Sequence, residues 1–407
     1  MMTRRLGTIV AVMAVALWTA TTAALGQTLQ ERVDALEKKV DEQQKSIAAT
    51  LGLDIHGMVA TDYLYNFNNP DSRENQFRVI DTDANSFTVN DGFLSIAHTR
   101  KEDNLGFVID MDFGKTGVAL GATDDATPRL REAYITYKVP FGPGINLKAG
   151  KFVTLLGYEV LKTWSSFNPN ITNSFLFGYA IPFTHTGLLA DVPLGDMFTL
   201  DIGVVNGWDN STDNNDGKTL LAGVGFNPTD ALSFYLSGTY GPEQSTHELV
   251  DSNGNPVLDA SGNPFVVHAG SSKRGVGTLV TTYKATKELS FVVDADYGNE
   301  SDLVPNSTGT GLTSALWYGA AGYAIYNLTD KISLNLRAET MVDSDGTRTG
   351  VSQTAWELTP TVGYQITDGL LWRGEYRHDE SNKQYFMSGD HYARGQDTIE
   401  TELIYGF

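Results

Sequence analysis

The sequence predicts an all-β transmembrane barrel of about sixteen antiparallel strands, preceded by a short N-terminal coiled-coil helix. Three observations lead to this prediction. Polar and apolar residues alternate from about residue 51 to the C-terminus, short and long connections alternate along the same region, and no second long apolar stretch follows the first 26 residues. A period of two gives a strand two unlike faces, as a wall between lipid and water requires. For any one segment, the edge strand of a soluble sandwich is the alternative.

Residues 1–26 have the features of a secretory signal peptide. Arg4 and Arg5 form a basic start, an apolar run covers residues 9–17, and small residues precede Gln27. The apolar run is shorter than the roughly 20 residues that a membrane-spanning helix needs. We therefore expect export of the chain and cleavage before Gln27.

The composition is acidic and contains no cysteine. The 49 acidic residues outnumber the 29 basic ones, which gives a formal net charge of −20. Nucleic acid is an improbable partner because its phosphates require a basic protein face. An exported chain without disulfides must be stabilised by other means.

Residues 27–50 predict a periplasmic coiled coil. Apolar residues recur there at alternating spacings of four and three, with Glu and Lys around them, which is a heptad seam. The seam positions are Leu29, Val33, Leu36, Val40, Gln43 and Ile47. Self-association is the expected role, and a single solvated helix is the alternative.

Residues 51–407 predict the barrel domain, in which one face of each strand is apolar and the other carries charge. In segment 332–342, for example, Leu334 and Leu336 alternate with Asn335 and Arg337. A dry core rejects unpaired charges, whereas a water-filled lumen accepts them, so the apolar face should contact lipid. The charged lumen positions proposed to line the pore include Glu132, Arg337, Glu339, Arg373, Glu375 and Arg377.

The connections between the strands also predict an outer-membrane barrel. Seven short turns begin near residues 99, 141, 192, 227, 284, 327 and 365, and eight longer loops cover about 68–84, 115–127, 156–180, 207–217, 241–273, 298–312, 343–352 and 379–394. Short turns on one side and long loops on the other are typical of outer-membrane barrels. Phe407, at the end of the alternating segment "TIETELIYGF", is expected to lie in the aromatic girdle.

Three stretches resemble a known family. "GKFVTLLGYE" (150–159), "FGYAIPFTHTG" (177–187) and "VVNGWDNSTDNN" (204–215) are similar to the OmpL-like outer-membrane β-barrel porins. The heptads resemble those that precede the barrels of some phosphate- and anion-type porins. The terminal Phe407 resembles the signal read by the barrel-assembly machinery.

This resemblance implies a diffusion channel whose third long loop folds inward and narrows the pore. The residues that we expect at the narrow point are Lys148, Lys151, Glu159 and Lys162. Alternatively, the loop aromatics, such as Phe175 and Phe177, simply pack the loop against the wall. The motif Pro-Glu-Phe-Gly-Gly, frequent in general diffusion porins, is absent from this loop.

The sequence thus predicts a bacterial outer-membrane porin that passes small hydrophilic solutes or ions, without catalysis, cofactor or metal. Its expected partners are outer-membrane lipid and lipopolysaccharide, the barrel-assembly machinery through Phe407, and copies of itself, three by family analogy. A barrel enzyme of the protease or phospholipase type is one alternative, with His185 and His378 as candidate bases, although no Gly-x-Ser-x-Gly motif is present. An adhesin or structural tether is the other alternative. The acidic repeats from Asp251 and Asp259 are read as turns rather than calcium loops.

Overall fold

The structure is a computed structural model that describes residues 39, 51–100, 104–251 and 253–407. The expected signal peptide and nearly all of the expected coiled coil lie outside the described residues, so both stay predictions. Within the described part of the chain, no helix is long and apolar enough to cross a membrane.

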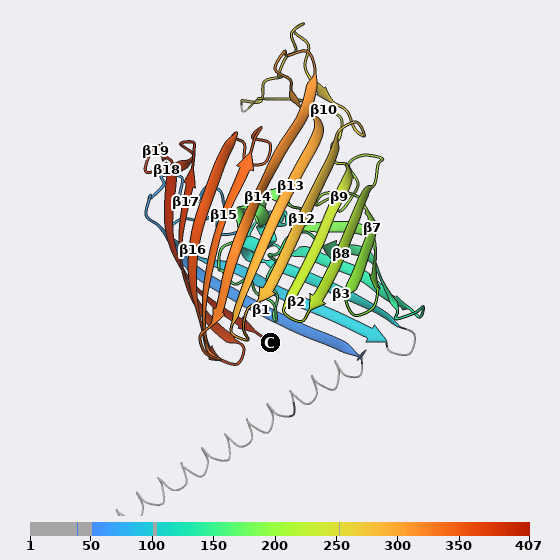
Figure 1. The fold of residues 1–407 in the computed structure, drawn as a ribbon. Helices are drawn as coiled ribbons and strands as arrows, with labels where there is room; N and C mark the ends of the chain where they lie inside the picture. The colour runs from blue at the N-terminus through green and yellow to red at the C-terminus, as the bar shows by residue number, and fades with distance from the viewer. Residues whose placement is uncertain (1–38, 40–50, 101–103, 252) are drawn as a thin grey trace, which may run out of the picture. The chain divides into compact units, whose positions relative to one another are not determined.

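Sixteen antiparallel strands close into one barrel, as the sequence predicts (Figure 1). Strand β1 pairs with β20, so the sheet has no free edge for lipid to contact. The barrel strands are β1 (Leu53–Asn66), β2 (Ser86–Arg100), β3 (Leu105–Phe113), β4 (Arg129–Val139), β5 (Ile145–Val153), β6 (Thr184–Pro193), β7 (Phe198–Val205), β8 (Thr219–Thr229), β9 (Leu232–Pro242), β12 (Lys273–Lys284), β13 (Leu289–Pro305), β14 (Leu312–Asn327), β15 (Ile332–Asp343), β16 (Gln353–Thr367), β17 (Leu370–Ser381) and β20 (Gly395–Gly406).

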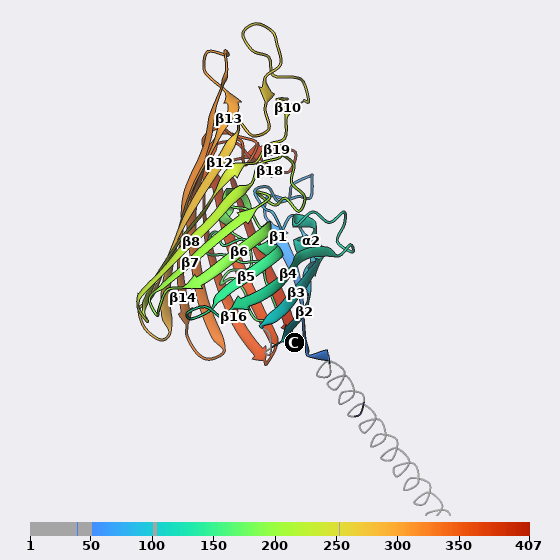
Figure 2. The ribbon, with the colours of Figure 1, turned by 90° about the vertical axis from the view of Figure 1, so that its right-hand side faces the viewer.

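The remaining elements lie in the long loops. They are helix α2 (Gly114–Ala119), the π-helical turn η1 (Leu176–Ala180), and the short pairs β10 (His247–Glu248) with β11 (Val266–Val267) and β18 (Phe386–Ser388) with β19 (His391–Ala393). The wall varies in height, because strand lengths range from 8 residues in β7 to 17 in β13 (Figure 2).

Seven short turns and eight long loops alternate around the barrel, as the sequence predicts. One expected loop is largely strand: β13 continues to Pro305 and β14 begins at Leu312, where 298–312 was expected to be irregular. The extension follows a bulge between Glu300 and Val304. The bulge interrupts the alternation of polar and apolar residues by which a strand is predicted from the sequence.

The two faces of the wall have the predicted character. On β15, Leu334 and Leu336 are 39% and 42% exposed on the outside, whereas Asn335 and Arg337 are 8% and 0% exposed inside. Apolar side chains therefore form the outer surface. The inward charges do not stand in open water, however, because they are covered by chain that fills part of the lumen.

The C-terminal residue closes the barrel seam. Phe407 exchanges two backbone hydrogen bonds with Gly57 of β1, at 3.0 and 3.1 Å. Its ring covers Gly57 so closely that a Cβ atom there would lie 2.6 Å from the ring. The exposed side chain, 62% accessible, is placed as a girdle residue would be.

Candidate pore constriction

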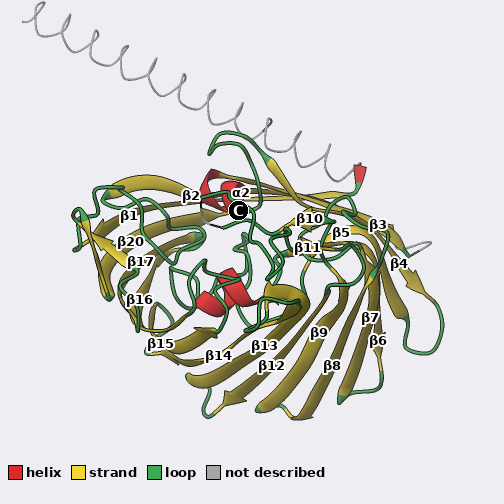
Figure 3. Ribbon diagram, turned by 90° about the horizontal axis from the view of Figure 1, so that it is seen from above, coloured by secondary structure: helices red, strands yellow, loops and turns green. Residues whose placement is uncertain are grey.

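The loop between β5 and β6, residues 154–183, enters the barrel; we call it the inner loop (Figure 3). Every residue from Asn170 to Phe177 is buried, whereas an ordinary connecting loop runs over the surface. A buried loop must find hydrogen-bond partners for its backbone, because unpaired N–H and C=O groups are costly away from water. The barrel wall supplies these partners.

Four arginines of the wall donate from Nη1 to carbonyl oxygens of the inner loop. The distance from Nη1 to the oxygen is 2.6 Å in each case. The pairs are Arg131 with Lys162, Arg337 with Thr172, Arg373 with Asn168, and Arg377 with Asn173. Charge-assisted hydrogen bonds of this length are among the stronger ones in proteins. These arginines therefore hold the loop across much of its length.

Three wall carboxylates accept the loop's N–H groups. Glu375 accepts from Ile171 and Thr172 at 2.6 and 3.0 Å, Glu339 from Phe175 and Leu176 at 2.5 and 3.3 Å, and Asp294 from Tyr158 at 3.0 Å. Wall arginines thus bind loop carbonyls while wall carboxylates bind loop amides. The alternation of sign on the inner face matches the alternation of donors and acceptors along the loop.

Ion pairs strengthen the attachment. Arg337, fully buried, lies between Glu159 of the inner loop at 2.8 Å and Glu357 of β16 at 2.7 Å. Lys162 of the loop pairs with Glu402 of β20 at 2.6 Å. Removal of one member would leave a buried charge without its partner, which is strongly destabilising.

Apolar contacts complete the packing. The Phe175 ring stacks on Phe77, from the loop after β1, with ring centroids 4.1 Å apart. Leu176 lies against Gly319 of β14, where a Cβ atom would come within 2.6 Å of it. The barrel interior therefore contains an apolar core like that of a soluble domain, in place of the wholly water-filled lumen that the charge pattern suggested.

Burial in the barrel interior shifts the pKa of two side chains, Tyr158 of the inner loop and Arg348 of the loop between β15 and β16. Burial, together with the Glu159 carboxylate, raises the pKa of Tyr158 to about 12, so its phenol stays neutral. Burial and the nearby Arg274 guanidinium lower the pKa of Arg348 to about 10, which still leaves it charged at neutral pH. Arg348 donates from Nε to the Tyr179 carbonyl at 2.6 Å and so holds the end of the inner loop.

A cavity of about 190 Å³ lies between the inner loop and the wall at β4 and β5. Arg131 and Glu132 line it from the wall, and Glu159, Phe177 and Phe183 line it from the loop. At about 30 Å³ for each water, it has room for about six. This gap is the candidate constriction.

β3–β7 carry two pairs of directly opposed carboxylates, and one pair includes Glu132, which lines the cavity. Asp110 of β3 faces Glu132 of β4, and Asp191 of β6 faces Asp201 of β7. Like charges in this register repel. Lys148 of β5 is the nearby base, with its Nζ 4.9 Å from the centroid of the Tyr134 ring. β3–β7 carry five carboxylates and five bases in all, so the excess of negative charge is confined to the two opposed pairs.

The structure separates the residues expected at the narrow point and on the lumen face. Glu132 and Glu159 line the cavity, whereas the Lys162 ammonium is bound to Glu402 and Lys151 donates from Nζ to the Leu130 carbonyl at 2.8 Å. Five other expected lumen residues are buried and form hydrogen bonds with the inner loop: Arg337, Glu339, Arg373, Glu375 and Arg377. Their assignment as pore-lining residues stays a proposal.

Sequence reasoning missed Arg131. A bulge between Asp110 and Met111 lets Arg131 and Glu132, neighbours in the chain, both lie buried in the wall, against the rule of alternating faces. It also missed Phe77, because the pattern gave no sign that the loop after β1 packs on the inner loop. No feature of a single sequence marks either position.

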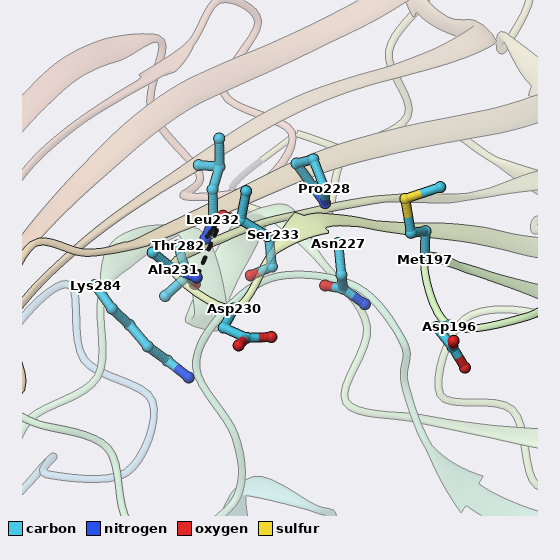
Figure 4. Close-up of a pocket in the computed structure, with 11 residues that line it drawn as sticks. Asp196, Met197, Asn227, Pro228, Asp230, Ala231, Leu232, Ser233, Thr282 and Lys284 are labelled. Carbon is cyan, nitrogen blue, oxygen red and sulfur yellow. Dashed lines mark hydrogen bonds between the residues drawn. The ribbon is translucent and has the colours of Figure 1, made fainter.

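A second hollow, of about 670 Å³, lies at the short-turn end (Figure 4). It is lined by turn residues such as Asp196, Asp230 and Lys284, all exposed, and Thr229 accepts the N–H groups of Ala231 and Leu232 there. It is built from ordinary turn geometry, and its lining residues lie outside the inner loop. Within the described ranges, no three His, Cys, Asp or Glu residues are grouped to hold a metal ion.

Comparisons with known proteins agree on the architecture. The family model described as "Putative beta-barrel porin-2, OmpL-like" matches residues 52–407. No curated protein matches the chain in sequence. Among solved structures, the channel DcaP of Acinetobacter baumannii is 13% identical and covers 87% of this chain and 97% of its own, with a TM-score of 0.57.

Two further solved structures are similar. The anion-selective porin of Comamonas acidovorans is 10% identical, with coverage of 87% and 99% and a TM-score of 0.58. OmpT of Vibrio cholerae, an outer-membrane protein recorded in trimer form, is 12% identical, with coverage of 87% and 99% and a TM-score of 0.57. At these identities the similarity shows the fold.

Proposed function

The chain belongs to the OmpL-like β-barrel porin family, and on this premise we propose that it is a bacterial outer-membrane channel for passive diffusion of small hydrophilic solutes or ions. The observation that carries the proposal is the inner loop, held inside a closed sixteen-strand barrel and leaving a small cavity beside the wall. Loop charges and pore width would select solutes by size and sign. Conductance of the purified protein in a planar bilayer tests it, and a silent bilayer contradicts it.

The expected targeting features fit this location. Residues 1–26 would direct export, and Phe407 would serve the barrel-assembly machinery. The apolar outer surface, with exposed Leu336, Tyr376 and Tyr405, suits lipid with aromatic residues near the interfaces. Lipopolysaccharide would surround the long-loop end.

We propose that the channel is a homo-oligomer, most simply a trimer, held in part by the coiled coil at 27–50. OmpT of Vibrio cholerae, which is similar in fold, is recorded in trimer form. Deletion of residues 28–48 is expected to leave barrels that conduct but associate less well. Sedimentation of the detergent-solubilised protein measures this, and an unchanged oligomer mass would assign the helix to another partner.

We expect a mild cation preference. The whole chain has 49 acidic against 29 basic residues, two pairs of carboxylates oppose each other on β3–β7, and the Lys162 charge at the expected narrow point is balanced by Glu402. Lys148 of β5, a strand between the two pairs, is one of the bases that oppose them. Close charges dominate once salt has screened distant ones.

The reversal potential under a salt gradient decides the sign of selectivity. Lys148→Gln is expected to strengthen the cation preference. A clear anion preference that Lys148→Gln abolishes would overturn the charge balance and make Lys148 the selectivity-determining residue.

The enzymatic alternative depends on His185, a candidate base. His185 is buried; Nδ1 lies 3.0 Å from the Gly207 carbonyl, and Nε2 lies 3.1 Å from Thr154 Oγ1, which lines the cavity. The Thr154 hydroxyl also accepts the Leu156 N–H at 3.2 Å, which is the geometry of a fixed turn. We therefore assign this pair to anchoring the start of the inner loop and propose no catalysis.

A further inference from the structure

The cavity beside the inner loop is lined by both a carboxylate and aromatic rings. Glu132 lines it on the barrel side, and the rings of Phe177 and Phe183, with centroids 5.1 Å apart, line it on the loop side. Carboxylates bind cations directly, and aromatic faces attract cations through the ring quadrupole. The cavity therefore offers two kinds of group that favour positive charge.

The carboxyl group of Glu132 faces another acidic side chain across the sheet. Glu132 Oε1 accepts the Val153 N–H at 2.9 Å, and its cross-strand neighbour is another carboxylate, Asp110. Asp110 is 5% exposed, and its Oδ1 has no hydrogen-bond partner among the described residues. A buried carboxylate oxygen without a donor is costly, so this pair is stabilised either by a proton shared between the two groups or by a positive partner in the cavity.

The nearby bases are occupied or displaced. Arg131, which also lines the cavity, is bound to Asp112 and lies 3.6 Å from Asp91. The Lys148 ammonium lies over the Tyr134 ring. The described residues include no ion pair to either Asp110 or Glu132 within 4.0 Å. The deficit of positive charge is thus local to this pair.

We infer that the cavity is a subsite for a small organic ammonium ion, with its charged group near Glu132 and its carbon chain against Phe177 and Phe183. This inference rests on the proposed function, since it names a class of solute that the channel would hold at its narrow point. A simple divalent cation is a poorer fit, because the described residues provide no group of three acidic ligands. A primary ammonium group can donate hydrogen bonds to a single carboxylate, while its carbon chain contacts the apolar surface.

Size is consistent with a short alkylammonium. The cavity of about 190 Å³ accommodates about six waters, and n-butylammonium has five heavy atoms. n-Butylammonium is therefore a suitable probe, with n-butanol as the neutral analogue and butyrate as the anionic one.

The test measures block of the potassium current by n-butylammonium in planar bilayers, on the full-length protein. Glu132→Gln removes the charge but keeps the size, and it is expected to weaken block at least about tenfold, as for loss of a charge-assisted hydrogen bond. The matched control is Asp201→Asn, which removes one lumen carboxylate outside the cavity and is expected to change block less than about threefold. Butanol and butyrate should not block.

A second variant tests the aromatic side independently. Phe183→Leu keeps an apolar side chain but removes the ring, and it is expected to weaken block by more than Phe167→Leu, which alters a ring of the same loop that does not line the cavity. Equal weakening by Glu132→Gln and Asp201→Asn would overturn the subsite, because it would indicate general screening. Absence of block in a conducting channel would overturn it as well.

A separate readout distinguishes this inference from the channel function. If the protein does not conduct, the proposed function fails, and calorimetric titration of the folded protein in detergent with n-butylammonium still decides the subsite. Binding that Glu132→Gln abolishes and Asp201→Asn preserves supports it. No binding, or binding indifferent to Glu132, overturns it.

Discussion

Replacing Arg337 by Met is expected to lower the free energy of unfolding by about 3–5 kcal/mol and to loosen the inner loop. Arg337 is fully buried and joins Glu159 of the loop to Glu357 of the wall. It also donates to the Thr172 carbonyl at 2.6 Å. Its loss leaves two buried carboxylates without the arginine between them and one carbonyl without its donor, so the loop backbone loses its central attachment.

Two measurements check this expectation. Urea titration of the protein in lipid vesicles, followed by tryptophan fluorescence, gives the loss of stability. Single-channel recording should show a noisier current, because the loop that narrows the pore would move. The wild-type noise level in Arg337→Met would contradict the assignment of Arg337 as the loop's main anchor.

A compensating variant separates lost charge balance from lost contact. Arg337→Met combined with Glu357→Met and Glu159→Gln removes this ion triad while keeping side-chain volume near its original value, and Arg377, 3.8 Å from Glu357, keeps Asp379 as its partner at 2.7 Å. Replacing a complete buried ion group by apolar residues is often neutral, whereas removing one member is not. The triple variant is therefore expected to regain much of the lost stability. A triple variant less stable than Arg337→Met would instead mean that the hydrogen bonds of the two carboxylates matter more than their charge.

The barrel could be predicted because its signal is periodic and repeated. Segment 332–342 alone shows apolar residues outward and Asn335 and Arg337 inward, and the structure has the same faces. Strand count followed from the alternation of short turns and long loops. Both inferences use local patterns, which a single sequence contains.

The interior could not be predicted in the same way. Period 2 places Arg337, Glu339 and Glu375 on the inner face, but it does not say whether water or another segment meets them there. The partner is the inner loop, which is far away in the chain: the Glu339–Phe175 and Glu375–Ile171 bonds join residues 164 and 204 positions apart. Such long-range pairing leaves no periodic mark in the sequence.

For the same reason, the net charge of the inner face cannot be obtained by adding up residues from the sequence. A literal count of inner-face charges treats Glu402 and Lys162 as separate, whereas the structure pairs them at 2.6 Å. What remains unpaired near the cavity is the small set on β3–β7, in which Asp110 and Glu132 face each other. Selectivity then depends on a few local groups, which is why single substitutions there are informative.

The outer face gives the second large expected effect. Leu336→Arg is expected to cost about 2–4 kcal/mol, because Leu336 lies in the middle part of β15, points outward and would place a guanidinium near the bilayer midplane. The same urea titration in vesicles measures it. Leu336→Gln, which is polar but uncharged, should cost less.

Depth provides the matched control for this prediction. Ile332→Arg makes the same chemical change on the same face, at the turn end of β15, where the cost should fall to about 0–1 kcal/mol because the side chain reaches the interface. Asn335→Arg, which the sequence pattern alone would treat as mild, is now expected to be costly for another reason: Asn335 is 8% exposed and donates to the Pro169 carbonyl of the inner loop at 2.8 Å. Its penalty should come with a disturbed current, whereas that of Leu336→Arg should not. Equal penalties at positions 332 and 336 would mean that depth in lipid does not set the cost, and the outer face would then have to contact something other than a bilayer.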